Sequence, residues 1–300
     1  MKNLPNISIV IPVYNGADYL EGCLQSLVDE DYPDLEIIVC DAGSKDGTVD
    51  IIKKFEDHIT WWVSEPDQGQ SDAINKGFAR ATGEIINWLC HDDRLEEGAL
   101  HLVGKTFADH PETDVLVGAS RLEDLTSGTN SLWVPNPTWF DFMPCCNPCP
   151  QPSTYYRRSL LRKGEPLRLD LVFSMDFELW NYFKSCGAKF RFIKDVLSIY
   201  LLTGENKTNL AGMRVIDALD QIYRTYTAEP IPLSTAYRYT RLYIDRLRIY
   251  QDKPWIYTVT SPVFKVLSFL LNKFYGAKRV AFISGQWGYY LPRKTTAFTI

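Results

Sequence analysis

The sequence predicts an α/β protein with a doubly wound, mostly parallel sheet, followed by a helical and aromatic C-terminal extension. Strand-like runs alternate with helix-like runs over residues 7 to about 124, and the strand-like runs are apolar along their whole length. Strands that are apolar throughout are typical of parallel sheets covered on both faces. The alternation of the two element types places the covering helices between successive strands.

The expected elements follow from these runs in order. Strands are predicted at residues 7–13, 36–40, 60–64, 84–89 and 114–119, and helices at 17–30, 46–57, 70–81 and 95–110. A region rich in Pro and Trp then leads to a short predicted helix at 154–162. The spacing of Phe177, Trp180 and Phe183 predicts a further helix at 174–186. A strand is predicted at 190–202, and helices beyond about residue 210.

Composition and charge narrow the class of protein. The chain has 300 residues, is 45% hydrophobic and carries a net charge of −5. Residues 231–300 hold eleven Lys or Arg and two Asp, a balance of +9 that leaves −14 on the rest. The acidic body argues against a nucleic-acid enzyme. The basic segment suggests contact with an anionic membrane surface, although a helix packed on the body or a dimer contact explains it equally well.

Two observations favour a cytoplasmic protein. The N-terminus lacks the charged, apolar and small-residue order of a secretory signal. Seven cysteines are an odd number, and Cys23, Cys40, Cys90 and Cys186 lie in apolar or helix-like segments, where Cys usually serves as a small buried hydrophobe. The remaining three, Cys145, Cys146 and Cys149, lack the partners of a zinc site. The run 262–275 is too short and too charged to span a bilayer.

Polar residues follow the predicted strands, and doubly wound sheets bind ligands beyond the carboxyl ends of their strands. Asp92 and Asp93 follow the fourth strand, where paired carboxylates suit Mg²⁺ or Mn²⁺ bridging to a diphosphate. A solvated turn or a helix cap is the alternative. Asp41 ends the second strand and could accept a hydrogen bond from a uracil N–H or a ribose hydroxyl, whereas the neighbouring Asp46 is a plausible helix cap.

An ordered series of motifs resembles the family 2 glycosyltransferases with a GT-A fold. The motifs are IVIPVYNG at 9–16, VCDAGSKDGT at 39–48, AINKG at 73–77, GEI at 83–85 and the Asp pair at 92–93. Residues 151–158 and 175–180 also look like family segments. The resemblance spans roughly residues 5–205. A dehydrogenase is disfavoured because no Gly-x-Gly-x-x-Gly turn follows the first strand.

The resemblance implies a nucleotide-diphosphate sugar donor, with UDP the expected nucleotide, and a divalent metal, Mn²⁺ or Mg²⁺. Asp93 would be the metal ligand, with Asp92 near the metal or the ribose. The implied contacts of the nucleotide sugar are Pro12, Tyr14, Asp41, Asp67, Asn75, Lys76, Asp92 and Lys207. Pro12 and Tyr14 would line the base pocket, Asp41 would bind the base, and Lys207 would lie in a loop that closes on the donor.

Asp176 resembles the catalytic base of the family. Such a base is needed because the attacking acceptor hydroxyl must lose its proton. The alternative is a helix cap, a role for which Ser174 competes. Many relatives carry a second acid directly before this base, where this chain has Met175. Trp180 lies one helical turn from Asp176 and is the candidate for contact with the acceptor, with a buried helix anchor as the alternative.

These inferences divide the chain into a catalytic domain at 1–208 and a helical basic extension at 209–300. Residues 1–124 would form its nucleotide-binding half and 125–208 its acceptor half. The expected function is inverting transfer of a sugar to a hydroxyl of a saccharide or lipid-linked acceptor, in cell-surface polysaccharide or glycolipid synthesis. The enzyme would be cytoplasmic and peripheral on the inner face of the membrane. A nucleotide-sugar-binding module without turnover is the alternative.

Overall fold

The computed structural model describes residues 4–204, 213–248 and 254–290. The chain divides into two compact units. The first comprises Met1–Pro137 and Pro148–Asn206, and the second comprises Thr138–Asn147 and Lys207–Ile300. Each unit is described by itself below. The sheet and the predicted site residues other than Lys207 belong to the first unit.

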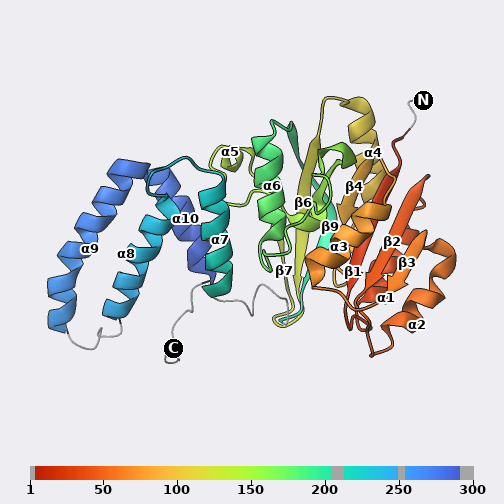
Figure 1. Cartoon of the computed structure of the whole chain (residues 1–300), viewed down its shortest axis with the longest axis horizontal. Coiled ribbons are helices and arrows are strands. Elements are labelled where there is room, and N and C mark those ends of the chain that lie inside the picture. The colour runs from red at the N-terminus through yellow and green to blue at the C-terminus, as the bar shows by residue number, and fades with distance from the viewer. Residues whose placement is uncertain (1–3, 205–212, 249–253, 291–300) are drawn as a thin grey trace. The chain divides into compact units, whose positions relative to one another are not determined.

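The first unit is built on a nine-stranded mixed sheet (Figure 1). Its order is β3-β2-β1-β4-β8-β6-β9-β5, with β7 paired to β6. Strands β1 to β4, β6 and β9 run parallel, while β5, β7 and β8 pair antiparallel with their neighbours. The strand bounds are β1 Ile7–Val13, β2 Leu35–Asp41, β3 Trp61–Ser64, β4 Ile85–Trp88, β5 Arg94–Leu95, β6 Val115–Asp124, β7 Thr129–Trp133, β8 Thr154–Arg157 and β9 Phe190–Leu202. The predicted α/β fold with a mostly parallel sheet is therefore confirmed.

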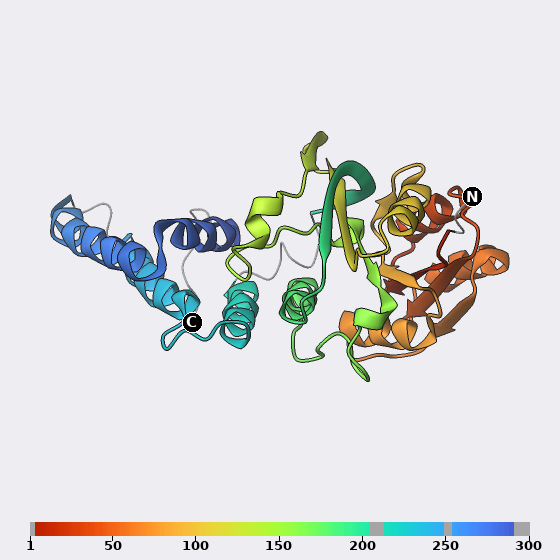
Figure 2. The ribbon, with the colours of Figure 1, turned by 90° about the horizontal axis from the view of Figure 1, so that it is seen from above.

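Helices cover both faces of this sheet because alternate residues of each strand point to opposite sides. Ile7, Ile9 and Ile11 join a core with helices α1 (Leu20–Val28), α2 (Thr48–Lys54) and α4 (Ala99–Asp109). The opposite face packs on α3 (Gln70–Arg80) and α6 (Met175–Ser185). Figure 2 shows α3 and α4 on opposite sides of the sheet. The sheet is therefore buried on both faces, as its apolar strands predict.

Helix α3 lies unusually close to β1. A Cβ atom built on Gly77 would lie 2.3 Å from Cγ1 of Val10, so only glycine permits this approach. On the same face, Trp88 of β4 stacks on Trp180 of α6, with ring centroids 5.9 Å apart. Phe78 of α3 meets Trp88 edge-on at 6.0 Å. These contacts fix the positions of α3 and α6 against the strands that carry the site.

The second unit is helical. Its helices are α7 (Met213–Thr225), α8 (Leu233–Arg248), α9 (Pro254–Tyr275) and α10 (Ala277–Tyr290). The short helix α5 (Pro137–Phe140) begins at the end of the first unit's segment and enters this one. Within the unit, Phe142 and Phe282 pack with ring centroids 4.8 Å apart, and Arg279 pairs with Glu229. None of the described helices combines the length and apolarity needed to cross a membrane.

Two sequence predictions of local structure are wrong. The segment 154–162 was expected to be a helix, but Thr154–Arg157 is strand β8 and Arg158–Leu160 is a short 3-10 turn. Thr and Tyr favour strands, and β8 gains pairing partners in β4 and β6. Leu95, expected at the start of a helix, lies in β5, and α4 begins at Ala99.

Candidate active site

The loops after β1 and β2 are tied together at the carboxyl edge of the sheet. The Asn15 N–H donates to Ser44 Oγ at 2.7 Å, and the Lys45 N–H donates to Asn15 Oδ1 at 3.1 Å. The Gly16 N–H donates to Thr48 Oγ1 at 2.9 Å. These bonds leave Tyr14 61% exposed beside a buried Pro12. The exposed ring of Tyr14 is available to a ligand at this edge.

Asp41 ends β2 and is almost completely buried, with 2% of its surface exposed. Its carboxylate accepts the N–H groups of Gly43 and Ser44, each at 3.1 Å, and the hydroxyl of Ser64 at 2.5 Å. The Ser44 hydroxyl also donates to it. The carboxylate therefore holds the β2 loop in shape, and contact with a nucleobase remains a prediction.

Three of the predicted donor contacts, Asp67, Asn75 and Lys76, interact with neighbouring residues of the chain. Asp67 Oδ1 accepts the Gly69 N–H at 2.8 Å, and Lys76 Nζ lies 3.0 Å from Glu65 Oε1. The buried side-chain amide of Asn75 exchanges two hydrogen bonds of 2.8 Å with the backbone of Leu167. Asn75 therefore anchors the segment that precedes α6, a structural role that its sequence position did not predict.

A tight turn after β4 brings Cys90, Asp92 and Asp93 together. The Asp93 N–H donates to the Cys90 carbonyl at 2.9 Å. One ligand atom from each of the three side chains lies within 4.8 Å of the others. Asp93 is completely buried, whereas Cys90 and Asp92 are partly exposed. We refer to these three residues as the 90–93 turn.

The Asp93 carboxylate has the environment of a metal ligand. Among the residues that the structure describes, no donor lies in good hydrogen-bond geometry to either of its oxygens, and the Leu201 backbone acts on the carboxylate only weakly. Burial raises the pKa of Asp93 well above its ordinary value, the charge of Asp92 raises it further, and the Leu201 backbone offsets part of the rise. A buried carboxylate without a partner costs free energy, which a divalent cation would offset by supplying the missing charge. The residues of the 90–93 turn therefore fit a divalent metal.

The first turn of α3 connects this metal-ligand group with the start of α6. Gln70 Nε2 donates to Cys90 Sγ at 3.3 Å, and the hydroxyl of the next residue, Ser71, donates to Met175 Sδ at 2.9 Å. Asp176 follows Met175 in the first turn of α6 and is partly exposed. Ser174 occupies the cap position of this helix but makes no capping hydrogen bond through its side chain.

Tyr200, near the end of β9, is influenced electrostatically by the same groups. Burial raises the pKa of Tyr200, and four nearby negative groups raise it further. In order of effect they are Asp93, Cys90, Asp92 and Asp176. The metal-ligand candidates and the predicted base therefore act on one hydroxyl. The roles of Asp92, Asp93 and Asp176 stay predictions.

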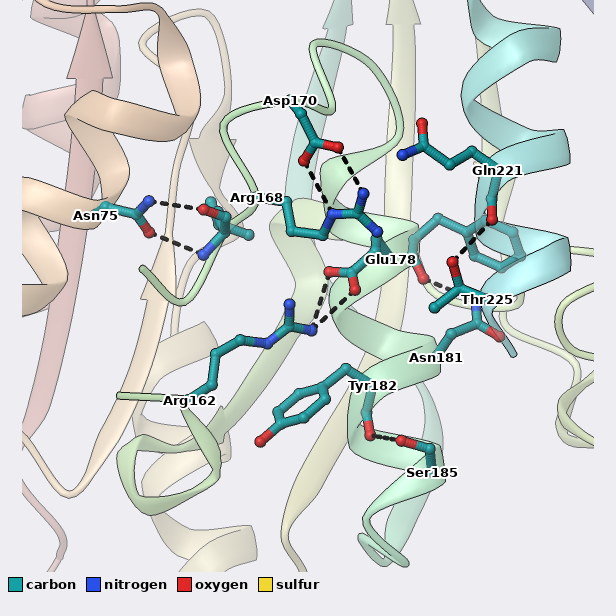
Figure 3. A network of polar contacts seen from close by, with 12 residues as sticks. Asn75, Arg162, Arg168, Asp170, Glu178, Asn181, Tyr182, Ser185, Gln221 and Thr225 are labelled. Atoms are coloured by element: carbon teal, nitrogen blue, oxygen red, sulfur yellow. Dashed lines mark hydrogen bonds and ion pairs between the residues drawn. The ribbon is translucent and has the colours of Figure 1, made fainter. Parts of the chain in front are cut away.

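A buried ion pair fixes α6 and the segment before it (Figure 3). Arg162 Nη2 lies 2.9 and 3.1 Å from the two carboxylate oxygens of Glu178. The Glu178 side chain is 2% exposed, and the Arg162 guanidinium also lies 4.0 Å from the centroid of the Tyr182 ring. Removing one partner of such a buried pair costs about 3–5 kcal/mol, because the other charge remains buried. The pair therefore holds the helix that carries Asp176.

The expectations for Trp180 and for two of the cysteines need correction, and the one for Lys207 is not tested. Trp180 has no exposed surface and stacks on Trp88, so it is a core residue and not an acceptor contact. Cys186 is exposed and Cys90 is partly exposed, whereas Cys23 and Cys40 are buried as expected. Lys207 lies outside the described residues.

Sequence reasoning missed Cys90, Gln70 and Tyr200 as members of this region. Cys90 was taken for a buried hydrophobe, although its position two residues before Asp92 was a local signal. Gln70 and Tyr200 come from distant parts of the chain, and their proximity depends on how α3 and β9 pack. No sequence motif marks them.

Part of the chain is similar to proteins of one known family. The profile described as Glycosyl transferase family 2 matches residues 8–141. An uncharacterized glycosyltransferase of Rickettsia typhi is 42% identical over 89 residues, which is 30% of this chain and 28% of that protein. The chain thus matches less than a third of the length of this relative. Residues 8–141 of the chain are thus similar to glycosyl transferase family 2 domains.

Solved structures show the same fold. The mannosyltransferase PcManGT from Pyrobaculum calidifontis, in complex with GDP-Man and Mn²⁺, is 18% identical with a TM-score of 0.59. The similarity covers 96% of this chain and 81% of that one. S. aureus TarS 1–349 in complex with UDP is 18% identical with a TM-score of 0.55, over 75% of this chain and 67% of that one. The sheet is therefore of the GT-A type.

Proposed function

We propose that this protein is an inverting, metal-dependent glycosyltransferase that moves a sugar from a nucleotide diphosphate, UDP in the first instance, to an acceptor hydroxyl. The observation that carries the proposal is the buried, unpartnered carboxylate of Asp93 beside Asp92, in the same region as Asp176. The family 2 domain supports nucleotide-sugar transfer. TarS with UDP and PcManGT with GDP-Man and Mn²⁺ support the choice of donor class and metal.

The proposed donor site follows the carboxyl edge of strands β3, β2, β1 and β4. Tyr14 would stack on the base over Pro12, and Asp41 would accept its N–H. Asp67 and Lys76 would lie further along the same edge, and Lys207 would contact the diphosphate. Residues 1–124 would thus bind the nucleotide, and 125–208 the acceptor. Asp93 and Asp92 would hold a divalent cation, which neutralises the departing diphosphate when bound.

Asp176 is the proposed base. It lies in the first turn of α6, where a negative charge interacts favourably with the helix dipole. It would accept the proton of the acceptor hydroxyl as that oxygen attacks the anomeric carbon. A single displacement of this kind inverts the configuration of the sugar. Glu178 is unsuited to the same role because it is buried and paired with Arg162.

A donor panel tests this function. Purified protein is incubated with UDP-, GDP- and dTDP-sugars in the presence of Mn²⁺, Mg²⁺ or a chelator, and nucleotide release is measured. We expect release from one or more UDP-sugars that stops with chelator and resumes when metal is restored. Release from GDP-mannose alone would correct the nucleotide. Binding without release or transfer from every donor would instead establish a non-catalytic nucleotide-sugar-binding module.

We further propose that α9 brings the enzyme to an anionic membrane surface and a lipid-linked acceptor, for cell-surface polysaccharide or glycolipid synthesis. Val263, Val266, Leu270 and Phe274 recur at helical spacing and are 39–75% exposed. Exposed Lys273 lies on the same side of the helix. An apolar face with interspersed lysines suits the interface of an anionic membrane on the cytoplasmic side. It would make the protein peripheral.

Vesicle binding tests this surface. We expect the protein to sediment with phosphatidylglycerol vesicles, and less with phosphatidylcholine vesicles, because Lys273 adds attraction of about 1 kcal/mol. The double variant Phe274→Ser and Lys273→Glu should remain in the supernatant. The matched control is Leu132→Ser, which replaces an apolar residue that is 58% exposed on β7. Equal sedimentation of the double variant and the parent would refute this role of α9.

A further inference from the structure

The 90–93 turn contains a thiol where a hard-metal site would have only oxygen. Cys90 Sγ belongs to the same group of ligand atoms as the carboxylates of Asp92 and Asp93, all within 4.8 Å of one another. Metal–sulfur bonds are about 2.3 Å and metal–oxygen bonds about 2.0–2.2 Å, so two ligands on opposite sides of one ion lie about 4.5 Å apart. The separation therefore suits a single cation that touches all three side chains.

The surroundings of Cys90 keep its sulfur directed at this group. The Gln70 amide donates a hydrogen bond to Sγ at 3.3 Å. The Cys90 thiol donates to Gln151 Oε1 at 3.9 Å, and Gln151 Nε2 donates to the Trp88 carbonyl at 2.8 Å. Amide groups that orient a metal-binding side chain are typical of protein metal sites. The unpartnered, fully buried carboxylate of Asp93 independently fits a cation at the same place.

We propose that Cys90 Sγ is a third protein ligand of the metal, and that this thiol makes the site prefer Mn²⁺ and softer divalent cations to Mg²⁺. The inference rests on the metal dependence of the proposed function and extends it to the choice of ion. Sulfur is a soft ligand that Mg²⁺ avoids, whereas Zn²⁺ and other transition-series ions accept it. Coordination replaces the thiol proton, which leaves to solvent, by a sulfur–metal bond.

Metal titration of the full-length, chelator-treated protein tests this proposal without any activity assay. Co²⁺ and Cd²⁺ serve as probes, because thiolate coordination produces charge-transfer absorption in the ultraviolet. We expect this absorption in the parent protein and its loss in Cys90→Ser, together with at least about tenfold weaker Cd²⁺ binding. The ratio of Mn²⁺ to Mg²⁺ affinity should also fall. The matched control, Cys186→Ser, changes an exposed cysteine outside the site and should behave as the parent.

A second measurement uses the unaltered chain and so does not depend on the folding of a variant. Alkylation of Cys90, read by peptide mass spectrometry, should slow when Cd²⁺ is present, whereas alkylation of Cys186 should not change. Absorption that persists in Cys90→Ser, or Cys90 alkylation that ignores the metal, would overturn the thiol ligand. If Mn²⁺ still binds the parent and Cys90→Ser equally but not Asp93→Asn, the proposed carboxylate metal site survives while the thiol inference fails.

Discussion

Asp176→Asn should reduce sugar transfer by about 10²–10⁴-fold, the contribution that a positioned general base makes to such reactions. Asparagine keeps the size and shape of the side chain but cannot take the proton of the acceptor hydroxyl. Donor binding should be unchanged, because the nucleotide and metal contacts are assigned to other residues. The check combines initial rates of transfer with the dissociation constant of the donor, measured calorimetrically.

Asp57→Asn is the matched control for this experiment. Asp57 is exposed in the 3-10 turn Glu56–His58, which precedes β3 and therefore lies at the amino end of the strands, away from the site. Its rate should equal that of the parent. Full turnover in Asp176→Asn would remove Asp176 as the base, and a rate that falls only together with donor affinity would indicate a binding role instead.

Asp93→Asn should abolish metal-dependent transfer and, at the same time, stabilise the metal-free protein. The loss of transfer should reach about 10³-fold, because a bound metal stabilises the transition state by several kcal/mol. The gain in the free energy of unfolding should be about 1–3 kcal/mol, since a neutral amide replaces a buried charge without a partner. Initial rates of transfer measure the first effect, and thermal unfolding with and without Mn²⁺ measures the second. Mn²⁺ should raise the midpoint of the parent only.

The pH dependence of stability gives an independent check on Asp93. Its pKa is raised in the folded protein, so the native state binds more protons than the unfolded state between the ordinary and the raised pKa. The metal-free parent should therefore lose stability as the pH rises through this window, and Asp93→Asn should lack that component. Asp57→Asn should follow the parent. A less stable Asp93→Asn variant that still responds to Mn²⁺ would contradict the assignment.

Local pattern was enough to predict most of the fold. The strands at 7–13 and 190–202 have the predicted bounds. The first is apolar or β-branched except for Ser8, the second is rich in aromatic and β-branched residues, and turn residues flank both. The strand at 154–157 was missed because its pairing partners, β4 and β6, are distant in sequence. Pattern also could not show that β5 pairs with β9, a contact that brings the 90–93 turn to Tyr200.

Some residues of the candidate site could be named from the sequence, whereas their burial and contacts could not. Asp92, Asp93 and Asp176 could be named because they sit in motifs at the ends of elements. The position of Trp180 in the core depends on packing between α6 and β4, which no local pattern encodes. The burial of Asp93 likewise depends on segments distant in sequence, among them Leu201 of β9. Cys90 could be assigned to the site only from the turn geometry, in which the Asp93 N–H donates to the Cys90 carbonyl and the three side chains lie together.

The close approach of α3 to β1 has a consequence for how enzymes of this design diversify. The first turn of α3 contacts the metal-ligand group through Gln70 and the start of α6 through Ser71. Two turns further along, Gly77 sets the distance between α3 and β1. A mutation that moves α3 away from β1 would therefore disturb both the proposed metal site and the helix that carries Asp176. Selection should act strongly against such a mutation. Surface loops that do not touch α3 carry no such double penalty. New acceptor preferences should accordingly arise there, while α3 and its glycine persist.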